Sequence, residues 1–307
     1  MRLLVTGGAG FIGSNFVHHV LNRHDDDGII TLDALTYAGS KNNLTAVLDD
    51  PRHTFVEGDI CDRELVTDLV KSVDAIVNFA AESHVDQSIE GARPFVETNV
   101  AGTQTLLDAA EENGVDRFLQ ISTDEIYGEI SDGEFVEDDP LNPRNPYAAT
   151  KAGADLLAQS YGTTHDVPVL ITRTCNNFGP RQHKEKLIPK FTELATAGKS
   201  LPVYGDGSNV REWIHVKDNC QAIDLVLRDG EIGDIYNIGT GEERTNLEVT
   251  HAILEEVGAD KELIEFVDDR PGHDQRYALN SSKIQSLGWE PKYSFEQGLK
   301  TTVEYYS

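Results

Sequence analysis

The stretch "RLLVTGGAGFIG", residues 2–13, decides the fold. An apolar, strand-like run leads directly into Gly7, Gly10 and Gly13, which are spaced three residues apart. Glycine allows a tight turn and a close approach of a pyrophosphate to the backbone, and a helix that starts there offers free N–H groups to the phosphates. The pattern predicts a dinucleotide-binding turn, although turn glycines without a ligand have the same spacing.

Asp33 supplies a second signal, because it ends the next apolar run, "IITLD" (29–33), about 20 residues beyond the glycines. A carboxylate at this place binds the ribose hydroxyls of the cofactor and would repel a 2′-phosphate. We therefore predict NAD rather than NADP. An ordinary loop aspartate is the alternative.

Two later strand ends are also suited to a cofactor. Asp59 and Ile60 in "GDICD" (58–62) are placed to cover the adenine ring, and Ala80 and Ala81 in "FAAESHVD" (79–86) leave room for the backbone to approach the cofactor. Strand ends with small residues but no ligand explain these two segments nearly as well.

Strand-like and helical segments alternate through the first half of the chain. The apolar runs are 2–6, 29–33, 53–58, 74–80, 116–122 and 167–173, and helices are expected at 11–23, from 62, up to 112 and at 146–165. Continuous apolar strands separated by helices predict a doubly wound parallel α/β sheet of the Rossmann type. Beyond residue 175 the alternation loosens, with helices at 217–229, 246–257 and 294–305, which predicts a smaller C-terminal α/β lobe. We place the boundary between domains 1–174 and 175–307.

The charge is strongly acidic: 26 Lys and Arg against 53 Asp and Glu give a net charge of −27. The acidic residues are spread along the chain, which favours adaptation to high salt over a basic partner and argues against nucleic acid. Three widely spaced cysteines, Cys61, Cys175 and Cys220, indicate reduced thiols in a cytoplasmic protein and no zinc framework. The glycine spacing at the start favours a phosphate-binding turn over an export signal, so we expect none, and no apolar run approaches the length of a membrane span.

Two motifs carry the candidate chemistry. "ISTDEIYG" (121–128) puts the hydroxyl of Thr123 beside the carboxylates of Asp124 and Glu125. Both acids can face one ligand only if the strand has already ended, because neighbouring strand residues point to opposite faces. "YAATK" (147–151) places Tyr147 and Lys151 on one helix face, where the ammonium favours the phenolate that a tyrosine base requires.

These motifs closely resemble the extended short-chain dehydrogenase/reductases, and within them the dTDP-glucose 4,6-dehydratases. The similarity runs nearly end to end, through "TGGAGFIGS", "LDALTYAG", "FAAESHVDQSI", "TNVAGT", "ISTDEIYG", "YAATKAGAD", "NNFGPRQHKEKLIP", "VYGDGSNVREWIHV" and "DRPGHDQRYAL". Nucleotide-sugar 4-epimerases share the glycine turn and the Tyr-Lys motif but typically lack the Asp-Glu pair, so this pair is the discriminating signal.

The resemblance implies an NAD-dependent hydro-lyase. Tyr147, assisted by Thr123 and Lys151, takes the proton of the sugar C4 hydroxyl while C4 passes a hydride to NAD. Glu125 then removes the C5 proton as Asp124 protonates the departing C6 hydroxyl, and the hydride returns to C6. One carboxyl group must start ionised and its neighbour protonated, which mutual repulsion favours.

The resemblance also implies the binding residues. The cofactor would be held by Gly7, Gly10, Phe11, Ile12, Gly13, Asp33, Asp59, Ile60, Ala80, Ala81, Tyr147 and Lys151. The sugar nucleotide would be held, mainly by the C-terminal lobe, through His84, Thr123, Asn176, Asn177, Lys186, Leu187, Pro202, Tyr204, Arg211, Asn246, Arg270, His273 and Tyr277. No metal is implied. Family members pair through two helices, so we expect a homodimer through the regions near 100–112 and 147–163.

Some features depart from the family. The segment between Gly128 and Pro140 is short and acidic, Phe178 stands where Tyr is common, and Arg181 follows the Gly-Pro pair. These differences affect the choice of nucleotide more than the chemistry. UDP- or GDP-sugar dehydration, 4-epimerisation and a non-catalytic NAD-binding protein therefore stay as alternatives, the last weakened by the presence of Tyr147 and Lys151.

Overall fold

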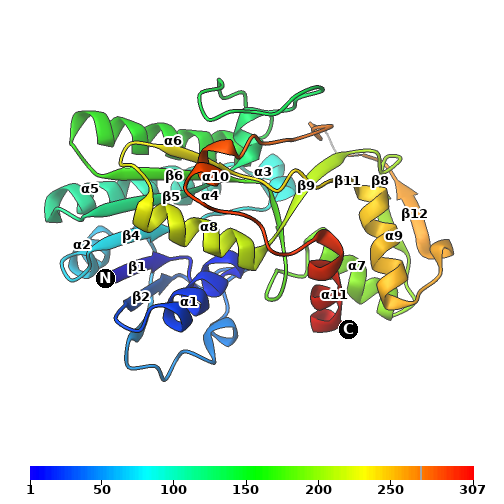
Figure 1. Ribbon diagram of the computed structural model, residues 1–307, viewed down its shortest axis with the longest axis horizontal. Helices are drawn as coiled ribbons and strands as arrows, with labels where there is room; N and C mark the ends of the chain where they lie inside the picture. The colour runs from blue at the N-terminus through cyan, green and yellow to red at the C-terminus, as the bar shows by residue number, and fades with distance from the viewer. Residues whose placement is uncertain (270–271) are drawn as a thin grey trace.

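The computed structural model describes residues 1–269 and 272–307. Its main layer is a seven-stranded parallel sheet in the order β10-β6-β5-β4-β1-β2-β3 (Figure 1). The strands are β1 (Arg2–Thr6), β2 (Gly28–Asp33), β3 (His53–Glu57), β4 (Ala75–Asn78), β5 (Arg117–Thr123), β6 (Val169–Thr174) and β10 (Ile235–Ile238). Strand order reverses at β1, where β1 pairs with β2 on one side and with β4 on the other. This confirms the predicted doubly wound fold, and ligands of such folds bind beyond the carboxyl ends of the strands at this point.

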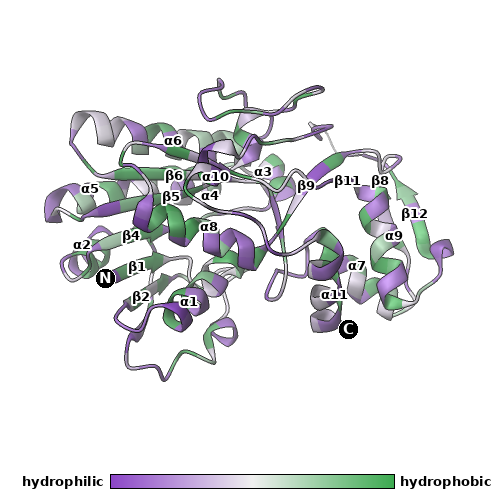
Figure 2. Cartoon of the chain, viewed as in Figure 1, coloured by the Kyte–Doolittle hydropathy of each residue, from purple (hydrophilic) through white to green (hydrophobic). Residues whose placement is uncertain are grey.

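Helices cover both faces of the sheet (Figure 2), which is why apolar residues of a central strand such as β1 are buried on both of its faces. Leu3 and Val5 point into the core beneath α1 (Phe11–Arg23) and α8 (Val216–Asp229), whereas Leu4 points into the core beneath the opposite helices. The opposite layer consists of α2 (Arg63–Val70), α5 (Thr103–Asn113) and α6 (Pro146–Thr164), preceded by the shorter α3 (Val85–Glu90), α4 (Arg93–Phe95) and the π-helical η2 (Val96–Gly102).

The smaller lobe has its own core, in which Phe178, Phe191, Trp213 and Phe295 meet. Its helices are α7 (Leu187–Thr196), α9 (Asn246–Val257) and α11 (Phe295–Tyr306), beside the parallel pair β8 (Leu201–Tyr204) and β12 (Ile264–Val267). The strands β7 (Asn176–Phe178), β9 (Val210–His215) and β11 (Glu243–Thr245) form a small sheet at the junction with the larger lobe. Short elements complete the chain: η1 (Lys41–Leu44), η3 (Asp124–Tyr127), η4 (Lys261–Leu263) and α10 (Ser282–Ser286).

Two features differ from the simplest expectation. The helix α7 is not among the helices expected beyond residue 175, and it contains Pro189. The proline lies in the first turn, where its missing N–H would have no partner in any case. The elements α8 and β10 follow residue 175 but belong to the larger lobe, since β10 pairs with β6. The division at residues 174 and 175 therefore stays a working proposal for the two lobes.

Candidate active site

The glycine turn has no room for side chains. Gly7 adopts a positive φ of 63°, and a Cβ atom there would lie 2.6 Å from the backbone nitrogen of Ala80. A Cβ on Gly13 would lie 2.3 Å from the carbonyl oxygen of Gly7. The strand end of β1, the start of α1 and the segment after β4 therefore pack against one another through glycine, and the start of α1 faces the cavity.

Asp33 is held rigidly at the end of β2. Its Oδ2 accepts a hydrogen bond from the backbone N–H of Ala9 at 2.9 Å, and its Oδ1 accepts one from Leu35 at 2.8 Å. Burial raises the pKa of this carboxyl, and the two N–H donors oppose that shift. The carboxylate thus lies between the glycine turn and the β2 end, where the ribose of a dinucleotide would fit.

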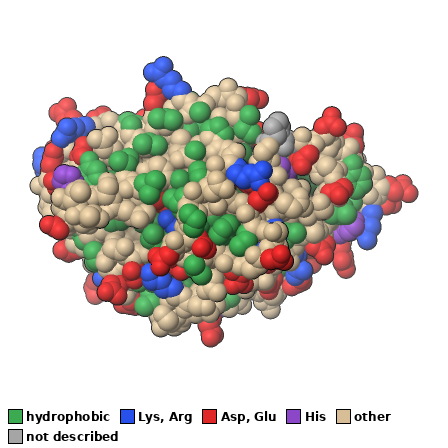
Figure 3. All heavy atoms as spheres, turned by 90° about the horizontal axis from the view of Figure 1, so that it is seen from above, with side chains coloured by type: hydrophobic (Ala, Val, Ile, Leu, Met, Phe, Trp, Pro, Cys, Tyr) green, Lys and Arg blue, Asp and Glu red, His purple; other side chains and the backbone are tan. Residues whose placement is uncertain are grey.

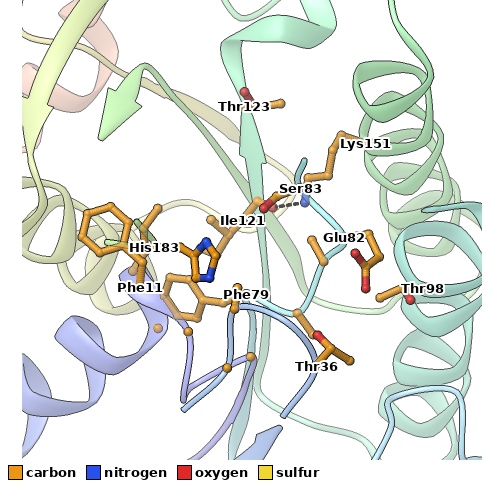
Figure 4. A pocket seen from close by; sticks show the side chains of 18 of the residues that line it. Phe11, Thr36, Phe79, Glu82, Ser83, Thr98, Ile121, Thr123, Lys151 and His183 are labelled. Carbon is orange, nitrogen blue, oxygen red and sulfur yellow. Dashed lines mark hydrogen bonds between the residues drawn. The ribbon is translucent and has the colours of Figure 1, made fainter. Parts of the chain in front are cut away.

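One cavity of about 350 Å³ joins these features to the chemical groups. Figure 4 shows Phe11 and Phe79 in the part of its wall opposite Thr123 and Lys151. Every residue predicted to hold the cofactor lines this cavity: Gly7, Gly10, Phe11, Ile12, Gly13, Asp33, Asp59, Ile60, Ala80, Ala81, Tyr147 and Lys151. The residues present therefore fit an NAD molecule. Small residues, which we call the glycine cradle (Gly7, Gly10 and Gly13), leave room for its phosphates, and the carboxylate of Asp33 at the end of β2 is placed to bind its ribose.

The strand β5 ends where the two acids begin. Thr123 is its last residue, and Asp124 and Glu125 open the 3₁₀ turn η3. The Thr123 hydroxyl caps this turn by accepting from the backbone N–H of Glu125 at 3.4 Å, and it also lies 3.2 Å from Asp124 Oδ1. Because the chain leaves the strand at this point, both carboxyl groups line the same cavity, as the sequence required.

The two acids have different environments. Asp124 is 2% exposed, and its Oδ2 has no hydrogen-bond partner among the described residues. Burial raises its pKa well above the usual range, and the neighbouring carboxylates of Glu125 and Glu212 raise it further. Glu125 is only partly buried and accepts a hydrogen bond from Asn145 Nδ2 at 3.1 Å. Asp124 is therefore the one of the two acids whose environment favours the protonated form.

Tyr147 and Lys151 lie on α6 and face the end of β5. The buried ammonium of Lys151 donates to the carbonyl oxygen of Ile121 at 2.6 Å. Burial lowers the pKa of Lys151 to about 8, and Asp155 opposes the shift. Burial raises the pKa of Tyr147, and Glu125 and Asp124 add to that increase. The expectation that the cation alone would lower the phenol pKa is therefore not met: low dielectric and two carboxylates outweigh it in this structure.

A second cavity, of about 620 Å³, opens between the lobes. Nine residues predicted to bind substrate line it: His84, Asn176, Lys186, Leu187, Pro202, Tyr204, Arg211, Asn246 and His273. Thr123 and Asn177 line only the first cavity. Tyr277 lines neither cavity. The guanidinium carbon of Arg211 lies 4.5 Å from the centre of the Tyr277 ring, and the Tyr277 hydroxyl donates to Asp274. The predicted Arg270 falls outside the described residues.

The two cavities meet at a shared rim. Six residues line both: Val85, Glu125, Asn176, His183, Glu185 and Lys186. Sequence reasoning missed Glu185, whose carboxylate lies 3.4 Å from the rings of both His84 and His183. It also missed Asn145, which caps α6 and donates to Glu125. The capping role was detectable, because Asn followed by Pro is a common helix start; the contact with Glu125 depends on tertiary structure.

Other site types receive no support from the part of the chain that is described. Across residues 1–269 and 272–307, His, Cys, Asp and Glu side chains form no cluster suited to a metal ion. No helix in those ranges is both long and apolar enough to cross a membrane.

Comparisons with known proteins agree over the whole length. The sequence model of the GDP-mannose 4,6 dehydratase family matches residues 4–302. A low-salt glycan biosynthesis protein of Haloferax volcanii is 69% identical over 306 residues, which cover 100% of this chain and 98% of that protein. A dTDP-glucose 4,6-dehydratase of Streptomyces niveus is 50% identical, covering 100% of this chain and 93% of its own. The solved structure of a dTDP-glucose 4,6-dehydratase from Streptomyces venezuelae, with NAD and dTDP bound, superposes with a TM-score of 0.98 at 54% identity, covering 100% and 97% of the two chains.

Proposed function

The chain belongs to the GDP-mannose 4,6 dehydratase family, and from this premise we propose that it is a dTDP-glucose 4,6-dehydratase. It converts dTDP-glucose to dTDP-4-keto-6-deoxyglucose and water, with NAD as cofactor. The similarity to dTDP-glucose 4,6-dehydratases at 50% and 54% identity supports this substrate. The arrangement of two acids, a tyrosine and a lysine around one cavity supports the chemistry.

The first half of the reaction is oxidation at C4. NAD, which the glycine turn and Asp33 would hold, would supply the acceptor for the C4 hydride and would return that hydride to C6. Tyr147 takes the proton of the C4 hydroxyl, Thr123 hydrogen-bonds to that oxygen, and Lys151 compensates the charge that develops on the phenol. The buried position of Lys151 makes its single positive charge effective, because low dielectric strengthens the interaction.

The second half is elimination of water across C5 and C6. The 4-ketone acidifies the C5 hydrogen, and Glu125 removes it as the C5–C6 double bond forms. Asp124 gives its proton to the C6 hydroxyl, which leaves as water. After C6 has been reduced, C5 regains a proton. The observation that carries this proposal is the burial of Asp124, which raises the pKa of its carboxyl, beside the hydrogen-bonded Glu125.

The substrate roles follow the same premise. We propose that His84 and Asn176 contact the sugar, that Lys186, Leu187, Pro202 and Tyr204 surround the nucleotide, and that the diphosphate meets cations. Arg211 lies in the wall of the second cavity, and its guanidinium suits phosphate geometry. The other proposed substrate contacts are Asn177, Asn246, Arg270, His273 and Tyr277.

Proton NMR in deuterated water tests the function. The protein is incubated in multimolar KCl with dTDP-glucose, and parallel tubes contain UDP-glucose and GDP-mannose. A C6 methyl signal with deuterium at C5 supports a dehydratase, and the tube with the fastest conversion identifies the nucleotide. Fastest conversion in a UDP or GDP tube would replace dTDP-glucose as the substrate. A galactose-type product would make the protein a 4-epimerase instead.

We further propose a homodimer through the helices near 100–112 and 147–163. Leu156 on α6 is 56% exposed and Val96 on η2 is 48% exposed. Figure 3 looks onto the α6 side of the molecule and shows hydrophobic side chains spread over this face. Light scattering at high salt measures the mass, and Leu156→Glu is expected to yield monomers. A monomeric parent protein would contradict the proposal.

The setting of the enzyme is also a proposal. We propose a cytoplasmic enzyme of a salt-adapted cell whose product enters glycan biosynthesis. The acidic side chains in Figure 3 are distributed around the visible face rather than gathered in one patch, which suits a protein surrounded by concentrated salt. The relative in Haloferax volcanii comes from a halophile, which supports salt adaptation, and its name refers to glycan biosynthesis, which supports the fate of the product.

A further inference from the structure

A fully buried arginine lies behind the catalytic groups. Arg173, near the end of β6, is 2% exposed, and Asp155 on α6 is 0% exposed. Arg173 Nε donates to Asp155 Oδ2 at 3.1 Å, and Arg173 Nη1 donates to the Tyr127 hydroxyl at 2.7 Å and to the carbonyl oxygen of Glu137 at 3.0 Å. A buried guanidinium is costly unless it is paired and hydrogen-bonded. These contacts therefore demand a specific geometry from each partner.

The partners of Arg173 belong to the two catalytic elements. Asp155 lies on α6, four residues after Lys151 and eight after Tyr147, so that all three side chains share one side of the helix. Tyr127 ends the turn η3, which begins with Asp124 and Glu125. Arg173 thus joins the helix that carries the oxidation groups to the turn that carries the elimination groups.

The connection has two arms: the Tyr127 arm, from Arg173 to the turn η3, and the Asp155 arm, from Arg173 to the helix α6. Further contacts fix each arm. The Tyr127 hydroxyl donates to Asn237 Oδ1 at 2.8 Å, and its ring stacks on Phe135 with centroids 4.9 Å apart. Arg173 also lies over the Tyr127 ring at 4.8 Å. On the other arm, Asp155 is the anion that opposes the effect of burial on Lys151. Loosening one arm leaves the other in place.

We propose that Arg173, Asp155 and Tyr127 are positioning residues that hold the oxidation and elimination groups in register. None of them lines either cavity, so they act through the groups they hold. A displacement of about 1 Å lowers a rate by as much as ~100-fold. The Tyr127 arm fixes Asp124 and Glu125, and the Asp155 arm fixes Lys151 and Tyr147.

The two arms predict opposite kinetic signatures. The inference rests on the proposed dehydratase function, in which NADH appears during oxidation and disappears after elimination. Tyr127→Phe removes one hydroxyl and loosens the turn, so NADH should appear at the parental rate and disappear about tenfold more slowly. Asp155→Asn loosens the helix, so NADH should appear about tenfold more slowly. In both variants KM should stay within about twofold of the parent, because the substrate cavity is untouched.

Stopped-flow absorbance of NADH after mixing with dTDP-glucose measures both phases. Tyr236→Phe is the matched control, since it also deletes a buried tyrosine hydroxyl, one that accepts from the N–H of Glu231 at 3.0 Å on the outer strand β10. The control should show parental phases. If Asp155→Asn does not fold, the comparison of Tyr127→Phe with Tyr236→Phe alone tests the positioning role.

If NADH appears and disappears in Tyr127→Phe at the parental rates, the inference is overturned. Equal slowing of both NADH phases in all three variants would also overturn it, because that result indicates a general packing role. The unaltered protein is measured in the same series. If it forms neither NADH nor product, the proposed function has failed; if it forms both while Tyr127→Phe is unchanged, only the positioning role has failed.

Discussion

Asp124→Asn removes the proton that we assign to the departing C6 hydroxyl while disturbing little else. The Oδ2 atom of Asp124 has no hydrogen-bond partner among the described residues, and Oδ1 lies 3.2 Å from the Thr123 hydroxyl. An asparagine keeps its carbonyl oxygen for Thr123 and matches the aspartate in size. The change therefore isolates proton donation from packing.

The expected effect on catalysis is large. Loss of a general acid costs about 100- to 10,000-fold in rate, or about 3 to 5 kcal/mol of transition-state stabilisation. In the proposed mechanism oxidation at C4 relies on Tyr147 and Lys151, so NADH and the 4-keto sugar should accumulate. In deuterated water Glu125 should still exchange the C5 hydrogen of that sugar. The control Glu125→Gln should block this exchange as well as the elimination.

The same substitution should stabilise the fold at neutral pH. The pKa of Asp124 is raised in the folded state by burial and by Glu125 and Glu212, so the folded protein binds this proton more tightly than the unfolded chain. Stability from this group is greatest at low pH and is lost as the pH rises from the unfolded pKa to the folded one. Asp124→Asn should thus raise Tm at pH 7, with the gain vanishing below about pH 4. Parental kcat, or a Tm gain that does not depend on pH, would refute the assignment.

Three further outcomes are expected. Gly13→Ala places a Cβ atom 2.3 Å from the carbonyl oxygen of Gly7, so NAD affinity measured by calorimetry should fall by at least about tenfold, ~1.4 kcal/mol; unchanged affinity would contradict the cradle. The kcat/KM value should fall above pH about 8 as Lys151 loses its proton. Lys151→Arg should shift this decrease to higher pH. A decrease that stays at the same pH would show that Lys151 is not the titrating group. With a net charge of −27, Tm and activity should fall as KCl is reduced from multimolar to dilute, because screening weakens; full stability in dilute buffer would argue against salt adaptation.

The sequence was sufficient for the elements whose cause is local. Hydrophobic periodicity or a local steric requirement was enough to predict four features, and contacts with distant residues do not change them. These are the glycine turn, the helix 11–23 and the strand ends at Asp33 and Thr123. The need for a turn at Asp124 and Glu125 also followed from strand geometry alone, because two adjacent strand residues face opposite sides. These local rules account for the residues predicted to hold the cofactor, all of which line the first cavity.

Contacts across the fold lay beyond local rules. Glu185 meets His84 across about a hundred residues of sequence, and nothing in "HKEKL" distinguishes it from a solvated acid. The pKa of Tyr147 moves opposite to the simple expectation, because its burial and its distance from two carboxylates are tertiary properties. The helix α7 was missed because a proline in a first turn resembles a breaker in sequence.

The shared rim explains why the chemistry is easier to infer than the substrate. In the proposed function, the sugar reaches the Tyr147 and Lys151 end of the first cavity and its nucleotide extends into the second. The substrate would then lie across the rim that includes Glu125, Asn176 and Lys186. Of the reacting groups, Glu125 lies on that rim. The others come from the end of β5, from η3 and from α6, which belong to the lobe that the glycine motif already predicts. The walls around the nucleotide come from α7, β8 and β9, whose spacing is set by packing between the lobes. Nucleotide choice is therefore a property of lobe geometry, and exchanging single residues in the sheet should change the rate without changing the preferred base.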